Sequence, residues 1–125
     1  MKTKTNELIG PALDWAVAKS EGERYGPPTF HVHQNSKGAT VYLNTGMQQS
    51  GIPYRPSTDW AQGGPIIERE GITLRSCIDG AAWDAELAYE ETILAPGPTP
   101  LIAAMRCYVA SKLGDEVDIP EELLK

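Results

Sequence analysis

The strongest structural signal in this sequence is a helix within the segment APGPTPLIAAMRCYVASKLGDE, residues 95–116. Thr99 is a favourable N-cap, Pro100 stands at the first helical position, and Gly114 stands where a left-handed C-terminal cap belongs. The residues at helical spacing that predict its buried side are Ile102, Met105, Val109 and Leu113, with Leu101 and Tyr108 alongside. Because such an apolar side must be covered by another element, we expect this helix to pack across a sheet.

A second helix is predicted near the N-terminus, where Gly10-Pro11 opens the stretch ALDWAVAKSEG and Gly22 ends it. The residues that predict its buried stripe are Ala12, Leu13, Ala16 and Val17. Trp15 lies off the centre of this stripe, so we expect its ring at the edge of the core rather than against a partner.

Segments of alternating polarity predict strands. Residues 29–33 and 39–44 alternate, and the QNSKG turn between them indicates a hairpin. Residues 83–89 also alternate, and although their composition suits a helix too, we favour a strand that pairs with this hairpin. Ile66-Ile67 and residues 72–74 frame the charged EREG, which indicates two short strands, or one strand interrupted at Gly71.

These elements predict an α+β fold: an antiparallel β-sheet with an N-terminal helix and a longer C-terminal helix packed on it. With 125 residues, 41% of them hydrophobic, the chain suits a single domain, 1–125. The acidic tail after Gly114 is expected to be short and bound to the surface.

Charge narrows the possible partners. The net charge is -6, and the basic residues are scattered, so binding to nucleic acid or to an anionic membrane is disfavoured. The start MKTKTNE has no signal-peptide core and no stretch reaches the length of a membrane span, so we expect a cytoplasmic protein. Cys77 and Cys107 lack the C-x-x-C spacing, and we expect reduced thiols rather than a disulfide.

The stretch YRPSTDWAQGGPIIERE, residues 54–70, is the candidate site. We expect an irregular binding loop over residues 45–65, because that span lacks periodicity and long loops in compact domains are commonly functional. Tyr54 and Trp60 offer flat faces for stacking, and the neighbouring hydrogen-bonding side chains are Ser57, Thr58, Asp59 and Gln62.

Two further candidate positions lie on the C-terminal helix. The start at Thr99 offers free backbone N–H groups to an anion such as a phosphate, although an ordinary capped helix explains the same pattern. Arg106 lies near the apolar stripe and needs an acidic or ligand partner if it is buried; we expect Glu68 to be that partner.

Catalytic and metal chemistry find weaker support. His31 and His33 would share one face of a strand, but a zinc site would need a third ligand such as Cys77, Cys107 or an acid. A hydrolase could be built from Ser57, a histidine and Asp59, yet the G-x-S-x-G motif is absent. Neither a phosphate-binding P-loop nor a G-x-G-x-x-G motif occurs, so we expect no cofactor and no enzyme activity.

Several stretches together resemble the NinX-like family of small bacteriophage and prophage proteins: PALDWAVAK, PSTDWAQGGPIIEREGI, the Trp83 segment and GPTPLIAAMRCYVASKLGDEV. The resemblance spans nearly the whole chain and implies an accessory phage protein acting in the bacterial cytoplasm; it implies no particular activity. The PSTDW run is also similar to a pattern in another phage family, one that sequesters a nucleotide-derived immune signal of the host.

The leading hypothesis is therefore a non-enzymatic protein that binds a small nucleotide-derived host molecule, plausibly to blunt an anti-phage defence. Its alternatives are an acidic interaction module that inhibits a basic host protein, and a small hydrolase of a nucleotide signal. We also expect a homo-oligomer, since small domains often complete a pocket at a subunit interface.

Overall fold

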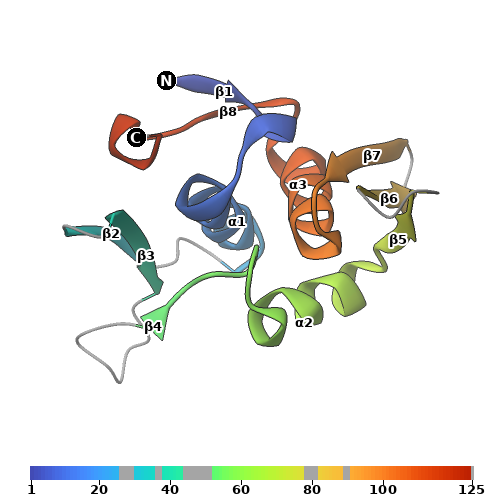
Figure 1. Ribbon diagram of the computed structural model, residues 1–125, viewed down its shortest axis with the longest axis horizontal. Coiled ribbons are helices and arrows are strands. Elements are labelled where there is room, and N and C mark those ends of the chain that lie inside the picture. The colour runs from blue at the N-terminus through green and yellow to red at the C-terminus, as the bar shows by residue number, and fades with distance from the viewer. Residues whose placement is uncertain (26–29, 36–37, 44–51, 78–81, 89–90, 125) are drawn as a thin grey trace.

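The chain folds as an α+β domain in which helix α3 lies at the centre, as the sequence predicts in outline (Figure 1). The computed structural model describes residues 1–25, 30–35, 38–43, 52–77, 82–88 and 91–124. The elements in chain order are β1 (Lys2–Lys4), the 3₁₀-helix η1 (Thr5–Glu7), α1 (Gly10–Tyr25), β2 (Phe30–Asn35), β3 (Gly38–Leu43), β4 (Ile52–Pro53), α2 (Trp60–Glu70), β5 (Thr73–Ser76), β6 (Trp83–Ala88), β7 (Thr92–Gly97), α3 (Pro100–Leu113), β8 (Glu116–Asp118) and η2 (Glu121–Leu123).

The described strands form three small antiparallel sheets rather than one. The predicted hairpin is confirmed as β2 and β3, with β4 beside β3, and the predicted strand at Trp83 is confirmed as β6. Its pairing with the hairpin is wrong, because β6 pairs with its chain neighbours β5 and β7 as a local meander. The third sheet joins the two ends of the chain through β1 and β8.

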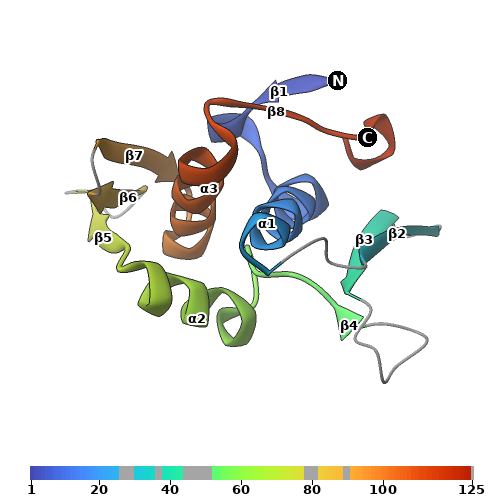
Figure 2. The ribbon, with the colours of Figure 1, turned by 180° about the vertical axis from the view of Figure 1, so that it is seen from behind.

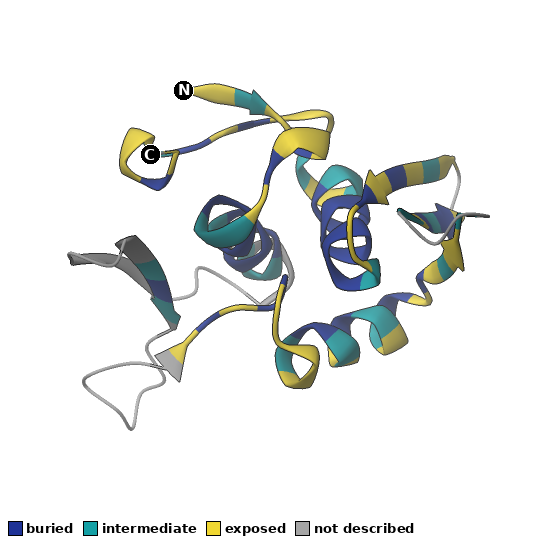
Figure 3. Cartoon of the chain, in the orientation of Figure 1, coloured by how far each residue is buried: buried dark blue, intermediate teal, exposed yellow. Residues whose placement is uncertain are grey.

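Helix α3 is buried around its whole circumference. It packs on β6 and β7 on one side and on α1 on the other, and Figure 2 shows the same order from behind. Every residue from Leu101 to Val109 is buried, well beyond the predicted stripe (Figure 3). The predicted start is confirmed, since the Thr99 Oγ1 accepts the Ile102 N–H at 3.1 Å. Gly114 has a positive φ of 88°, but its ψ of -166° lies outside the left-handed helical region, so the predicted left-handed cap is wrong.

Helix α1 begins at Gly10 as predicted but continues three residues past its predicted end at Gly22, to Tyr25. A single glycine inside a helix costs only about 1 kcal/mol relative to alanine, so it does not have to terminate one. Trp15 is half-buried against the core with the Lys19 ammonium 5.3 Å from its ring centroid, which confirms its place at the core edge.

Helix α2 occupies residues where the sequence indicated the end of a loop and a strand at Ile66-Ile67. That interpretation was wrong, because Gly63-Gly64-Pro65 acts as part of a helix here and not as a break. The helix has local signals at both ends: the Asp59 carboxylate accepts the Ala61 N–H at 2.9 Å, and Gly71 is left-handed with φ 70°. Residues 45–51 of the predicted loop lie outside the described residues.

The C-terminal tail is part of the core, contrary to the prediction of a surface-bound tail. Val117 and Ile119 are buried, and Leu123 is buried in η2. The alternation of acidic and apolar residues in this segment places the acids outward and the apolar side chains inward. Among the described helices, none is long and apolar enough to cross a membrane.

Candidate functional site

A tight turn at Pro56–Thr58 lies between β4 and α2, and its backbone is closely tied. The N–H groups of Thr58 and Asp59 both donate to the Arg55 carbonyl oxygen, at 3.1 and 2.8 Å. The Gln62 side chain spans the base of the turn by accepting the Arg55 N–H and donating to the Pro53 carbonyl oxygen at 2.8 Å. The turn is therefore held in one conformation by the segments before and after it.

One side of this turn borders a cleft of about 200 Å³ between the starts of α2 and α3, which we call the Trp60 cleft. Its lining residues are Ser57, Thr58, Trp60, Thr99, Pro100, Leu101 and Ile102. Trp60 is 53% exposed, which is unusual for so large an apolar side chain. The cleft therefore offers an accessible aromatic ring beside an apolar wall and two threonine residues.

The other side of the turn borders a cleft of about 160 Å³, the Arg55 cleft, at the start of α1. Its lining residues are Gly10, Pro11, Asp14, Thr40, Val41, Arg55 and Thr58. Thr58 belongs to both linings, so the two clefts meet at this residue. Arg55 itself is exposed.

Asp14 and Ser57 link α1 to the turn from beneath. Asp14 is 4% exposed, and its carboxylate accepts the Ser57 backbone N–H at 2.9 Å. Burial raises the pKa of Asp14 to about 6, while the hydrogen bonds to Ser57 and the charge of Arg55 partly oppose that rise. The Ser57 hydroxyl is close enough to Asp14 to lower its pKa, yet it makes no hydrogen bond of standard geometry with any described group. Asp14 therefore has a structural role, because its carboxylate fixes the backbone of the turn against α1.

The structure brings four of the eight predicted site residues into one cleft: Ser57, Thr58, Trp60 and Thr99. Gln62 and Asp59 lie next to the turn, but their side chains are used within it, Asp59 as the N-cap of α2. Tyr54 is only 8% exposed and is part of the core, so its ring is not free for stacking.

Arg106 lies outside both linings. It is 8% exposed, and its guanidinium donates to the carbonyl oxygens of Leu8 at 2.9 Å and Pro96 at 3.0 Å. Burial lowers its pKa. The predicted pairing with Glu68 is wrong because backbone carbonyls satisfy the arginine, which joins α3 to η1 and β7.

The sequence model of the family described as bacteriophage P22, NinX, matches residues 4–112. The chain belongs to the NinX family of bacteriophage proteins. This match covers α1, α2, all of α3 except its last residue, and both clefts, and it ends before β8 and the 3₁₀-helix η2. No curated protein sequence is significantly similar to the chain.

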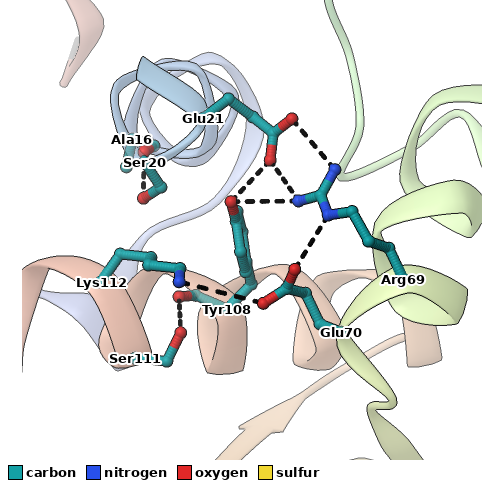
Figure 4. Close-up of polar contacts among 8 residues, drawn as sticks. All are labelled: Ala16, Ser20, Glu21, Arg69, Glu70, Tyr108, Ser111 and Lys112. Atoms are coloured by element: carbon teal, nitrogen blue, oxygen red, sulfur yellow. Dashed lines mark hydrogen bonds and ion pairs between the residues drawn. The ribbon is translucent and has the colours of Figure 1, made fainter. Parts of the chain in front are cut away.

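The helices of this NinX-family protein are held together by a polar network around Tyr108 (Figure 4). The Tyr108 hydroxyl donates to the Glu21 carboxylate at 2.5 Å and accepts from Arg69 at 3.2 Å. Arg69 also pairs with Glu21 and with Glu70, and Lys112 approaches Glu70 at 4.0 Å. Tyr108 is fully buried and its hydroxyl is satisfied, so we interpret the network as a structural link between α1, α2 and α3.

Sequence reasoning missed Asp14 and Arg55 as candidate site residues. Asp14 had a usable signal, because it is an acid between the buried residues Leu13 and Ala16 of an amphipathic helix. Arg55 had no sequence signal beyond its place in the Tyr54–Glu70 stretch, because its position in a cleft depends on the start of α1, which lies opposite the turn.

The predicted chemistries involving histidine are not tested by this geometry. His31 and His33 lie on β2 opposite Tyr42 and Thr40, but their side chains are outside the described residues. Within the described residues, no group of three His, Cys, Asp or Glu side chains could hold a metal ion. Cys77 and Cys107 are free thiols, and burial raises the pKa of Cys107 to about 11.

Larger clefts occur elsewhere on the molecule. One of about 380 Å³ lies between η1, β7 and β8, and one of about 390 Å³ lies between the start of α1 and the C-terminal residues. These clefts are larger than the Trp60 cleft, but their linings contain neither an exposed aromatic ring nor a buried hydroxyl without a partner of standard geometry. We therefore do not favour them as small-molecule sites.

Proposed function

We propose that this phage accessory protein binds a small nucleotide-derived molecule of its bacterial host in the Trp60 cleft, and that it sequesters this molecule without converting it. The observation that carries the proposal is the exposed ring of Trp60, which lines a cleft together with the buried residue Ser57. Stacking of a base on an aromatic side chain contributes roughly 1–3 kcal/mol per base.

The surroundings of Trp60 suit recognition of a base or ribose. Leu101 and Ile102 supply apolar surface, while Thr58 can donate and accept hydrogen bonds at the rim. The backbone of the turn is already fixed, so little order has to be created when a ligand arrives.

Sequestration is favoured over catalysis by the state of the nearby carboxylates. Asp59 is engaged as the cap of α2, and Asp14 lies beneath the turn at 4% exposure. Neither carboxylate lines the Trp60 cleft, and Asp14, which lines the neighbouring Arg55 cleft, is buried and accepts the Ser57 backbone N–H, so neither is placed to act as a general base on a ligand beside Trp60.

The test is calorimetric titration and thermal shift of the purified protein with adenosine, AMP, ADP-ribose and cyclic dinucleotides. We expect at least one of them to bind, and Trp60→Ala to weaken its binding by about 5–150-fold, the range that stacking of one base supplies. Because Trp60 is half exposed, its replacement should leave the melting temperature nearly unchanged. Leu94→Ala is the matched control, since Leu94 is 59% exposed and lies outside both clefts.

Recovery of the bound compound after denaturation separates the enzyme alternative from sequestration. An intact compound supports sequestration, whereas a converted compound would support the hydrolase. We also propose that the protein self-associates, which size-exclusion chromatography with light scattering would detect; a monomer at high concentration would contradict this.

A second function is favoured by the cleft of about 380 Å³ described above. Its lining includes the acids Glu91, Asp115 and Glu116, one base, Lys4, and the exposed Leu94. This composition suits a basic protein partner. If no small molecule binds, we expect a host protein to be retained by the wild type and lost with Leu94→Arg.

A further inference from the structure

We infer that the ligand spans both clefts, with its aromatic part against Trp60 and an anionic group against Arg55. This inference rests on the proposed function and specifies the ligand as a phosphorylated nucleoside rather than a neutral one. Three features support it: the two clefts share Thr58, the Arg55 guanidinium has no partner among the described residues, and the helix starts at the Trp60 cleft offer few free donors.

The two clefts are neighbours on either side of a single turn. Thr58 lines both, and Ser57 lines the Trp60 cleft while its backbone N–H is bound to Asp14 of the Arg55 cleft. Because Thr58 is exposed, a ligand that crosses this side chain at the surface would contact both linings. Their volumes of about 200 and 160 Å³ suit parts of one molecule better than two separate ligands.

Arg55 differs from the other described arginine side chains. Arg69 pairs with Glu21 and Glu70, Arg75 pairs with Glu86, and Arg106 donates to backbone carbonyls. The Arg55 guanidinium makes no hydrogen bond or ion pair with any described residue, and its charge acts on the buried Asp14 only at longer range. Because a guanidinium presents a planar fork of donors that matches phosphate, it is suited to an anionic ligand group.

The Trp60 cleft is poorly suited to hold that anion itself. At the start of α3, Pro100 has no N–H, and the Ile102 and Ala103 N–H groups already bind Thr99. At the start of α2, the Asp59 carboxylate caps the helix and adds a negative charge. The anion seat that the sequence indicated at Thr99 therefore has few free donors, and the positive charge lies on the Arg55 side of the turn.

The buried Ser57 hydroxyl is the second feature that indicates a ligand. It is 1% exposed, it lacks a partner of standard geometry among the described residues, and Ser57 is part of the cleft lining. Such a hydroxyl would gain a hydrogen bond of standard geometry from a ligand group that reaches it. Ser57 lines the Trp60 cleft next to Thr58, and we place the ribose of the phosphorylated nucleoside at these two residues.

The experiment compares three probes that share an adenine: adenosine, AMP and ADP-ribose. Each is titrated calorimetrically into the wild type and into Trp60→Ala, Arg55→Gln and Arg75→Gln. Arg75→Gln is the matched control, because Arg75 is exposed and paired with Glu86 outside both clefts. We expect Arg55→Gln to weaken AMP or ADP-ribose by about tenfold or more and to leave adenosine unchanged.

Ionic strength gives a second readout. The affinity of the phosphate-bearing probes should fall as salt rises in the wild type and in Arg75→Gln, and this dependence should be smaller in Arg55→Gln.

The outcomes separate this inference from the proposed function. If the probes bind and require Trp60, but Arg55→Gln changes adenosine and its phosphates equally or changes none, the spanning ligand is wrong and the Trp60 site stands. If no probe binds the wild type, the proposed function fails and the inference fails with it.

Discussion

Gly63 allows α2 to lie directly on the turn that forms the candidate site, and replacing it with alanine tests that arrangement. A Cβ atom at this position would lie 2.5 Å from the Leu101 Cδ1 atom and closer still to the Pro56 carbonyl oxygen. Leu101 is itself buried at 2% exposure, and the Pro56 oxygen belongs to the backbone of the turn. The Pro56 oxygen cannot move away without displacing the turn, whereas the Leu101 side chain would have to change its rotamer inside a packed interior.

The size of the effect follows from two opposing contributions. Alanine improves helix propensity by about 1 kcal/mol over glycine, whereas forcing a methyl group into a packed interior costs about 1–3 kcal/mol. Because both close contacts are well below van der Waals distance, we expect the clash to prevail, with a net loss of about 1–2 kcal/mol in the free energy of unfolding. For a domain of this size that loss lowers the melting temperature by roughly 3–10 °C.

Gly64→Ala is the matched control in the same helix. Its Cβ atom would meet only the Trp60 Cε3 atom, at an ordinary distance of 3.9 Å. The gain in helix propensity is offset by the crowding that Pro65 imposes on the preceding residue, so we expect a change within about 0.5 kcal/mol.

Urea denaturation followed by circular dichroism measures both variants under the same conditions. If Gly63→Ala is as stable as the wild type, or more stable, then α2 does not lie on Pro56 and Leu101 as described. The geometry of the Trp60 cleft would then be wrong as well, because α2 forms one of its walls.

Two other substitutions test the buried polar groups. The pKa of Asp14 is raised from 3.8 to about 6 in the folded protein, so between these pH values the folded chain holds a proton that the unfolded chain has released. Because of this group, the free energy of unfolding should fall by up to about 3 kcal/mol as pH rises from 4 to 7. Asp14→Asn should remove that fall and should be more stable than the wild type at pH 7. If the free energy of unfolding depends on pH in the same way in the variant, the assignment to Asp14 is contradicted. Tyr108→Phe should lower the free energy of unfolding by about 1–2 kcal/mol, because it removes the hydroxyl that binds Glu21 and Arg69, and a double-mutant cycle with Glu21→Gln should show strong coupling. Additive effects in that cycle would mean that the hydroxyl does not join the helices.

The elements that the sequence predicted well are those whose signals are local. Thr99 and Gly114 mark the ends of α3 by short-range backbone chemistry, and the hairpin follows from alternation around one turn. Helix α2 was missed because glycine and proline inside it resemble a loop, and the reason for Gly63 is a contact with Leu101 from a distant segment. Propensity describes the chain near a residue and cannot indicate that neighbour.

The candidate site also contains residues that the sequence could predict and residues that only the folded structure reveals. Ser57, Thr58 and Trp60 could be named together because they are adjacent in the sequence, whereas the opposing wall is supplied by α3. Asp14 reaches the turn from 43 residues away, and Arg106 is satisfied by carbonyls that no pattern in the sequence indicates. Partners of this kind are set by the packing of helices, so they follow only from the folded chain.

The closed backbone of the Pro56–Thr58 turn has a consequence for binding kinetics. Its N–H groups are bound to Arg55 and Asp14 before any ligand is present, so no slow rearrangement has to precede or follow the encounter. In stopped-flow mixing under excess ligand, the observed rate should then increase linearly with ligand concentration and should not level off. The dissociation rate alone would then set the lifetime of the complex. A phage protein in excess over a scarce host molecule would bind that molecule at the rate at which the two meet by diffusion.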